Sequence, residues 1–141
     1  MKKVRLGKTG LTVSRVGIGG IPIQRPTLEE AIRIVNRALD LGINFIDTSI
    51  GYGDSEIRIG KAIKDRRDEV YIATKGSWRS SNDATSSIND SLNRLGVEHI
   101  DLWQFHNIRD LQAFSQVISP SGALEAAKNA LKSGKIGHLG F

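Results

Sequence analysis

The sequence predicts an α/β fold of the (β/α)8 TIM-barrel kind, in which parallel strands alternate with helices. Three observations lead to this prediction: short apolar runs recur along the chain, amphipathic stretches lie between them, and most runs are apolar on both faces. A parallel sheet that is covered by helices requires this pattern. The chain has 141 residues, whereas a closed barrel typically needs about 250. We therefore expect a single domain, 1–141, with about four βα units and a fifth strand.

A β-hairpin is expected before the first βα unit, because KVRLG and LTVSR alternate in character around a turn that ends at Gly10. The first strand of the sheet is then RVGIGG, and a helix is expected from about Leu28 to Leu41. Thr27 and Glu30 form a capping-box pattern at the start of this helix, and Gly42 ends it. The apolar stripe of the helix is expected at Ala31, Ile34, Val35, Ala38 and Leu41.

Three further units follow, with predicted strands NFIDT, VYIATK and IDLWQFH. Their helices are expected at about 55–63, with Asp54 as a cap, at about 83–95, which Gly96 ends, and at 122–132, with Ser121 as the cap. The connection before the last helix is longer than the others, and DLQAFSQVI has the composition of a short helix within it. The fifth strand is IGHLGF. No linker or low-complexity tract interrupts the series.

Composition argues against several classes of function. There is no cysteine, and the three histidines are far apart, so we expect no metal site. The net charge of +5 comes from Lys and Arg that are scattered as on an ordinary solvated surface, and the aromatic residues are not interleaved with basic runs. We therefore expect no nucleic-acid partner. No apolar stretch resembles a signal peptide or is long enough to span a membrane, so a reducing, cytoplasmic setting is expected.

Four polar residues lie at or just after the ends of predicted strands: Asp47, Tyr52, Lys75 and His106. In a barrel, the carboxyl ends of all strands point to one face, so residues about sixty positions apart can converge there. A phenol, an ammonium, a carboxylate and an imidazole in one pocket make a plausible proton-donating site. A free tyrosine titrates near 10, and a neighbouring cation would favour its phenolate form and so ease proton donation at neutral pH.

Each of the four also has an ordinary alternative. Tyr52 stands between two glycines and suits a turn, while Asp47 suits a turn or a helix cap. His106, taken alone, would be a hydrogen-bonded core histidine. Lys75 could extend its ammonium to the surface, or it could form a Schiff base, as in barrel aldolases. The tyrosine favours the proton-donating site over the aldolase.

Several segments together carry a family resemblance: LGKTGLTVSRVGIGG, GINFIDTSIGYGDSEIRIGKAI, VYIATK, LGVEHIDLWQFHN and GKIGHLGF. The chain resembles the N-terminal half of an aldo-keto reductase over residues 3–141, with the segments in family order and at family spacing. The wording of GGIPIQR, GYGDSE and GALEAAKNALKSGKIGHLGF is also similar to a prokaryotic subgroup whose members often carry a C-terminal iron–sulfur extension.

The resemblance implies an NAD(P)H-dependent reductase that acts on a small aldehyde or ketone. Its catalytic tetrad matches Asp47, Tyr52, Lys75 and His106, with Tyr52 as the general acid and His106 orienting the substrate carbonyl. NADPH is the cofactor expected from the family, with NADH as the alternative. Gly20, Ile21 and Asp47 are the residues expected to touch it, because the family draws its other cofactor contacts from later strands.

A second interpretation is non-enzymatic. Four βα units and one strand cannot close an eight-stranded barrel, so the chain could be an incomplete or pseudoenzyme half-barrel that does not bind a cofactor. In this interpretation the strands at both ends of the sheet are unpaired, and exposed strand edges favour pairing with other chains. We therefore expect the 141-residue chain alone to self-associate through its open barrel edges.

Overall fold

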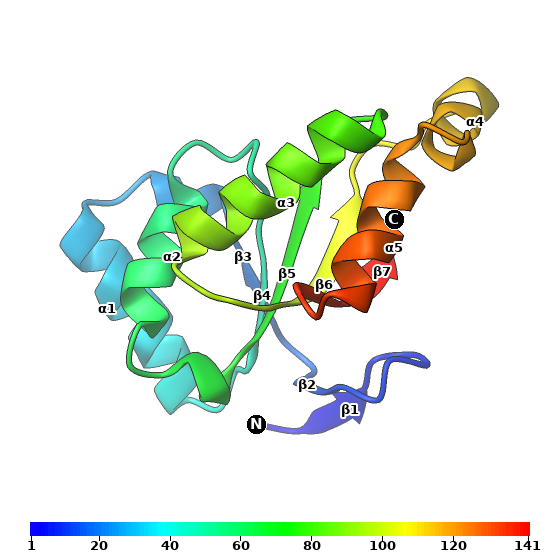
Figure 1. Cartoon of the computed structure of the whole chain (residues 1–141). Coiled ribbons are helices and arrows are strands. Elements are labelled where there is room, and N and C mark those ends of the chain that lie inside the picture. The colour runs from blue at the N-terminus through cyan, green and yellow to red at the C-terminus, as the bar shows by residue number, and fades with distance from the viewer.

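The computed structural model describes residues 1–141 and confirms the α/β class. Five parallel strands form one sheet in the order β3-β4-β5-β6-β7 (Figure 1). Their bounds are Ile18–Gly19, Phe45–Asp47, Tyr71–Gly76, Ile100–Phe105 and Ile136–Gly140. Each strand pairs with its neighbours in the chain, so β3 and β7 form the two edges of the sheet. Right-handed βα crossovers produce this order when consecutive units are added to one side.

The helices follow the strands in turn. The α-helices α1 to α5 span Leu28–Asp40, Ser55–Ile63, Ser81–Leu95, Leu111–Ile118 and Ala123–Lys132. Helices α1, α2, α3 and α5 lie side by side over one face of the sheet, whereas α4 lies beyond the end of α5 (Figure 1). Two short 3-10 helices, η1 and η2, span Ile21–Gln24 and Arg67–Glu69. Helix α4 lies in the connection after β6, where the sequence predicted a short helix. Every predicted strand and helix is therefore present, with shifts of a few residues at its ends.

Two of the predicted helix caps differ from the structure. Gly122, and not Ser121, is the N-cap of α5 and offers no side-chain cap. The carbonyl of Ser121 instead accepts a hydrogen bond from the amide of Ser81 at 2.8 Å, which joins this turn to the start of α3. Asp54 is the N-cap of α2 by position, but its side chain pairs with Arg58 and not with a backbone amide.

Helix α1 has its predicted cap but a different apolar stripe. The Thr27 hydroxyl accepts from the Glu30 amide while the Glu30 carboxylate accepts from the Thr27 amide, and the bond to that amide holds the pKa of Glu30 below its usual value. The buried stripe is Ala31, Val35 and Leu39, whereas the predicted members Ile34 and Leu41 are 48% and 52% exposed. A spacing of four residues keeps the buried side chains on one helical row.

The hydrophobic core lies between the sheet and the helices. Strand residues that face the helices, such as Ile46, Ile72 and Trp103, are fully buried there. Helices α2 and α3 approach closely at Gly60, where an added Cβ would lie 2.2 Å from the carbonyl oxygen of Leu95. The other face of the sheet is only partly buried and carries Asp47, Lys75 and Gln104.

The predicted hairpin is confirmed as β1 (Lys3–Arg5) paired with β2 (Thr12–Ser14). It forms a separate two-stranded sheet at the amino-terminal end of the main sheet (Figure 1). Asn44, which precedes β4, fastens it there. The amide of Ser14 donates to Asn44 Oδ1 at 2.6 Å, and Asn44 Nδ2 donates to the carbonyl of Thr12 at 3.0 Å. The opposite, carboxyl-terminal end of the sheet is left open.

Candidate active site

The carboxyl-terminal ends of the strands bring the predicted site residues to one rim. Asp47 is the last residue of β4, Lys75 is the last but one of β5, and His106 directly follows β6. The parallel register aligns Asp47 with Ala73 and Lys75 with Gln104. Because side chains alternate along a strand, this register directs Asp47, Lys75 and Gln104 to the sheet face that the helices leave free.

The ammonium of Lys75 is held by two oxygen atoms. Its Nζ donates to Asp47 Oδ1 and, at 2.9 Å, to the carbonyl of Thr48. The Lys75 side chain is 13% exposed, whereas that of Asp47 is 41% exposed. An ammonium that is so largely removed from water requires such partners, and the pair therefore places a fixed positive charge on the rim.

Tyr52 reaches the same rim from the loop between β4 and α2. Lys75 Nζ lies 5.2 Å from the centroid of the Tyr52 ring. The rings of Tyr52 and His106 meet edge to face, with centroids 5.9 Å apart and planes at 85°. The structure therefore brings together all four residues that the sequence placed in the site, with the cation and the imidazole both beside the phenol ring.

His106 is partly buried in this cluster. Burial of the imidazole, and next the positive charge of Lys75, lower the pKa of His106 below its ordinary value of 6.5. The carboxylate of Asp47 opposes this shift, and the positive charges of Arg79 and Arg109 add to it. His106 is therefore neutral at pH 7. A neutral imidazole can donate one hydrogen bond to a carbonyl oxygen without adding a second cation to the site.

The residues expected to touch a cofactor lie next to this cluster, at the end of β3. Ile21 is 45% exposed, and an added Cβ at Gly19, which is paired with Asp47, would meet no atom within 4 Å. This part of the rim is therefore open to solvent. Gly20 is different, since it is buried with an added Cβ only 2.5 Å from Thr48 Oγ1, and its amide and carbonyl are both bonded within the chain.

Sequence reasoning missed one rim residue, Gln104. Its Nε2 donates to Asp47 Oδ2 at 3.1 Å, so each carboxylate oxygen of Asp47 has a partner. Gln104 lies on β6, two residues before His106, which directly follows that strand. A polar residue at this spacing within an apolar strand was the available signal.

A second group of polar residues was also missed, because it lies behind the rim. Thr48, Ser55, Glu56 and Thr74 are all buried. Thr48 Oγ1 and Ser55 Oγ are 2.9 Å apart, and Thr74 Oγ1 donates to Glu56 Oε1 at 2.7 Å. These bonds join α2 to the ends of β4 and β5. The loop that carries Tyr52 therefore starts and ends on a hydrogen-bonded support.

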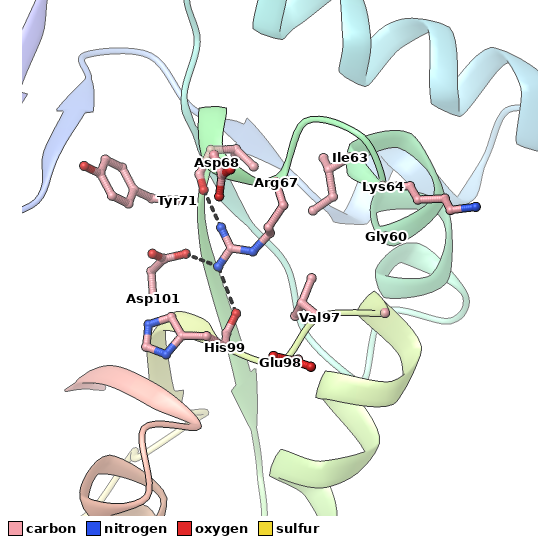
Figure 2. A pocket seen from close by; sticks show the side chains of 12 residues that line it. Gly60, Ile63, Lys64, Arg67, Asp68, Tyr71, Val97, Glu98, His99 and Asp101 are labelled. Carbon is pink, nitrogen blue, oxygen red and sulfur yellow. Dashed lines mark hydrogen bonds and ion pairs between the residues drawn. The ribbon is translucent and has the colours of Figure 1, made fainter.

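A hollow lies at the amino-terminal ends of β5 and β6, opposite the rim (Figure 2). Its polar side chains hold the fold together. Arg67 crosses it and donates to Asp101 Oδ2 at 2.7 Å, to the carbonyl of His99 at 2.8 Å and to the carbonyl of Val70. Every one of these acceptors belongs to a strand or to its approach. Arg67 thus joins the amino ends of β5 and β6, and we assign the hollow no ligand.

No group of three or more His, Cys, Asp or Glu side chains is placed to hold a metal ion. None of the helices is long and apolar enough to cross a lipid bilayer.

Comparison with known proteins shows the family of the chain. The family model described as "Aldo/keto reductase family" matches residues 15–141. The chain belongs to the aldo/keto reductase family. The resemblance stated from the sequence is thereby confirmed, and the five parallel strands match the barrel of solved family members over nearly the whole chain.

Individual relatives give the extent of the match. The chain is 33% identical to the 6-dehydroglucose reductase of Novosphingobium aromaticivorans, over 96% of its own length and 49% of the relative's. It is 33% identical to the NADH-specific methylglyoxal reductase of Escherichia coli, over 99% and 51%. The crystal structure of an aldo-keto reductase from Klebsiella pneumoniae in complex with NADPH superimposes with a TM-score of 0.82 at 26% identity, over 99% and 48%. The chain therefore spans about half the length of the relatives it matches.

Proposed function

We propose that the protein reduces a small aldehyde or ketone to an alcohol with a nicotinamide cofactor. The observation that carries the proposal is the cation beside the phenol: Lys75 Nζ is held by Asp47 and lies 5.2 Å from the centroid of the Tyr52 ring. A phenol in this position is suited to give its proton to a carbonyl oxygen, since the cation stabilises the phenolate that remains.

The chain's own residues divide the work. Tyr52 donates the proton to the substrate oxygen. Lys75 stabilises the phenolate, and Asp47 fixes Lys75 through one oxygen while Gln104 holds the other. His106, neutral at pH 7, donates a hydrogen bond that orients the substrate carbonyl. The ion pair also argues against the aldolase, because an ammonium bonded to two oxygen atoms offers no free electron pair for an imine.

The cofactor supplies the hydride that the substrate carbon receives. The open rim around Ile21 and Asp47 fits one face of a nicotinamide ring. Gly20 fits less directly, because packing against Thr48 and Ser55 already accounts for the glycine. The Klebsiella relative was solved with NADPH and the Escherichia coli relative is named for NADH. NADPH is the form we expect, and NADH is the alternative to be tested beside it.

The test is the Tyr52→Phe variant, made in the polypeptide encoded by the complete reading frame. It keeps the ring but removes the proton donor, so turnover of a small aldehyde with NADPH should fall by about 10²- to 10⁴-fold. The matched control is Tyr71→Phe, which changes the chain's only other tyrosine, at the start of β5. Tyr71→Phe should leave turnover unchanged.

The outcomes separate the role of Tyr52 from the reaction itself. A Tyr52→Phe variant that reduces carbonyls at nearly the wild-type rate contradicts the assignment of the general acid. A wild-type protein that neither reduces a panel of small aldehydes and ketones nor binds either nicotinamide cofactor contradicts the proposed function. In that event the pseudoenzyme interpretation would stand.

A further inference from the structure

Glu56 is a carboxylate that is completely removed from solvent. It lies on α2 and its exposed fraction is 0%. A buried carboxylate is unfavourable unless it is paired and hydrogen-bonded. Both oxygen atoms of Glu56 have partners, since Thr74 Oγ1 donates to Oε1 at 2.7 Å and Arg94 Nε donates to Oε2 at 3.0 Å. The surrounding fold thus supplies a partner for each oxygen atom of a fully buried carboxylate.

The partners of Glu56 connect the two halves of the proton-donating pair. Thr74 directly precedes Lys75 on β5. Arg94, from the last turn of α3, extends past Glu56 and donates through Nη2 to the carbonyl of Gly53, the residue that directly follows Tyr52. A short series of hydrogen bonds therefore leads from the strand of the cation to the loop of the phenol.

The backbone at Gly53, which accepts the hydrogen bond from Arg94, is tightly surrounded. Its φ is +53°, in the left-handed region that favours glycine. An added Cβ there would lie 2.5 Å from Gln24 Oε1, so the segment is enclosed on one side by η1 and bonded by Arg94. The rest of the loop is bonded internally, with the Tyr52 amide donating to the Ser49 carbonyl at 3.0 Å.

We propose that Arg94, oriented by Glu56, is a positioning residue that fixes the Tyr52 loop relative to Lys75. This inference rests on the proposed function and extends it to residues that do not touch the substrate. Arg94 suits the task because its planar guanidinium can bond a carboxylate and a carbonyl at once, which the single ammonium of a lysine does less well. Without this attachment, the phenol would sample positions away from the cation and the substrate oxygen.

The first test measures the loop itself, by amide hydrogen exchange at Tyr52 and Ser55. Both amides are bonded within the loop, the second to the Tyr52 carbonyl at 3.0 Å. In Arg94→Lys, which keeps a cation beside Glu56, exchange at these amides should quicken by about 10-fold or more, because local opening becomes easier. The matched control is Arg67→Lys at the other end of the sheet, where another arginine joins a carboxylate to backbone carbonyls. It should leave both amides unchanged.

The second test separates positioning from a merely structural role. Turnover of Arg94→Lys, in the polypeptide from the complete reading frame, should fall by about 10- to 100-fold while the KM for the cofactor stays the same, since small displacements of a reacting group have effects of this size. The double variant Glu56→Gln/Arg94→Met removes the buried charge together with its partner. The double variant should be more stable to urea than Arg94→Met alone. Its turnover, however, should be as low as that of Arg94→Met.

Three results would overturn the proposal. The first is unchanged exchange at Tyr52 and Ser55 in Arg94→Lys. The second is faster exchange with unchanged turnover, which would mean that the attachment does not position the phenol. The third is a double variant that regains turnover along with stability. If the wild-type protein reduces no carbonyl, the proposed function fails, and the exchange measurement alone then decides whether Arg94 holds the loop.

Discussion

Removing either member of the Lys75–Asp47 pair should have unequal effects on stability, because the two side chains are unequally buried. Asp47→Ala leaves the Lys75 ammonium, whose side chain is 13% exposed, with only the Thr48 carbonyl. Stranding one ion of a fully buried pair costs about 3–5 kcal/mol, and an exposed pair contributes about 0–1 kcal/mol. Asp47→Ala lies between these limits and should cost about 2–3 kcal/mol.

Lys75→Met leaves the Asp47 carboxylate without its ammonium, but this carboxylate is more exposed to water than the ammonium is. The Asp47 side chain is 41% exposed and still accepts from Gln104 Nε2 at 3.1 Å. Methionine fills the place of the aliphatic stem, so Lys75→Met should cost about 1 kcal/mol or less. The double variant should be more stable than Asp47→Ala alone, since it removes the stranded ammonium.

The measurement is urea unfolding followed by tryptophan fluorescence, for which the fully buried Trp103 is the reporter of the core. The two single variants and the double variant form a complete thermodynamic cycle. The reasoning is refuted if Lys75→Met is as destabilising as Asp47→Ala, or if the double variant is less stable than Asp47→Ala.

Three further predictions concern single positions. In an NMR titration, His106 should take up its proton at a pH below 6.5; because unfolding restores its ordinary pKa, its contribution to stability should be present above about pH 6.5 and decrease as the pH falls. A midpoint at or above 6.5 would contradict this. Gly60→Ala should destabilise the protein by about 1–3 kcal/mol through overpacking against the Leu95 carbonyl, and an unchanged urea midpoint would show that α2 and α3 can separate at no cost. Borohydride added with a carbonyl substrate should leave the mass of Lys75 unchanged, whereas a covalent adduct there would support the aldolase.

Sequence patterns predicted the elements of the fold because most of their signals are local. The capping box at Thr27 and Glu30 marks the start of α1, and Gly96, with φ of +65°, ends α3. The stripe of α1 was predicted less well, since the exposure of Ile34 depends on where the neighbouring helices lie. The cap of α5 failed for a similar reason, because the Ser121 carbonyl is used by a segment about forty residues earlier.

In the candidate site too, some residues were predicted from the sequence and others were not. Strand ends and the family resemblance predicted the tetrad, whose convergence follows from the parallel register. The supporting residues were not predicted, since their importance arises from bonds across the fold. Gln104 bonds Asp47 from 57 positions away, and Arg94 bonds Glu56 from 38 positions away. Glu56 did leave a signal, as an acidic residue on the same helical face as the buried Ile59 and Ile63.

The position of the hairpin determines the orientation of the molecule when it is attached to a surface through Met1. Met1 is 56% exposed and lies beside Gly42, at the amino-terminal end of the sheet. The hairpin that follows it is fastened to Asn44 and contributes nothing to the rim around Tyr52. A linker or dye joined to Met1 would therefore stand at the end opposite the proposed chemistry. Molecules immobilised through it would present their open rims to the solution, all in the same orientation.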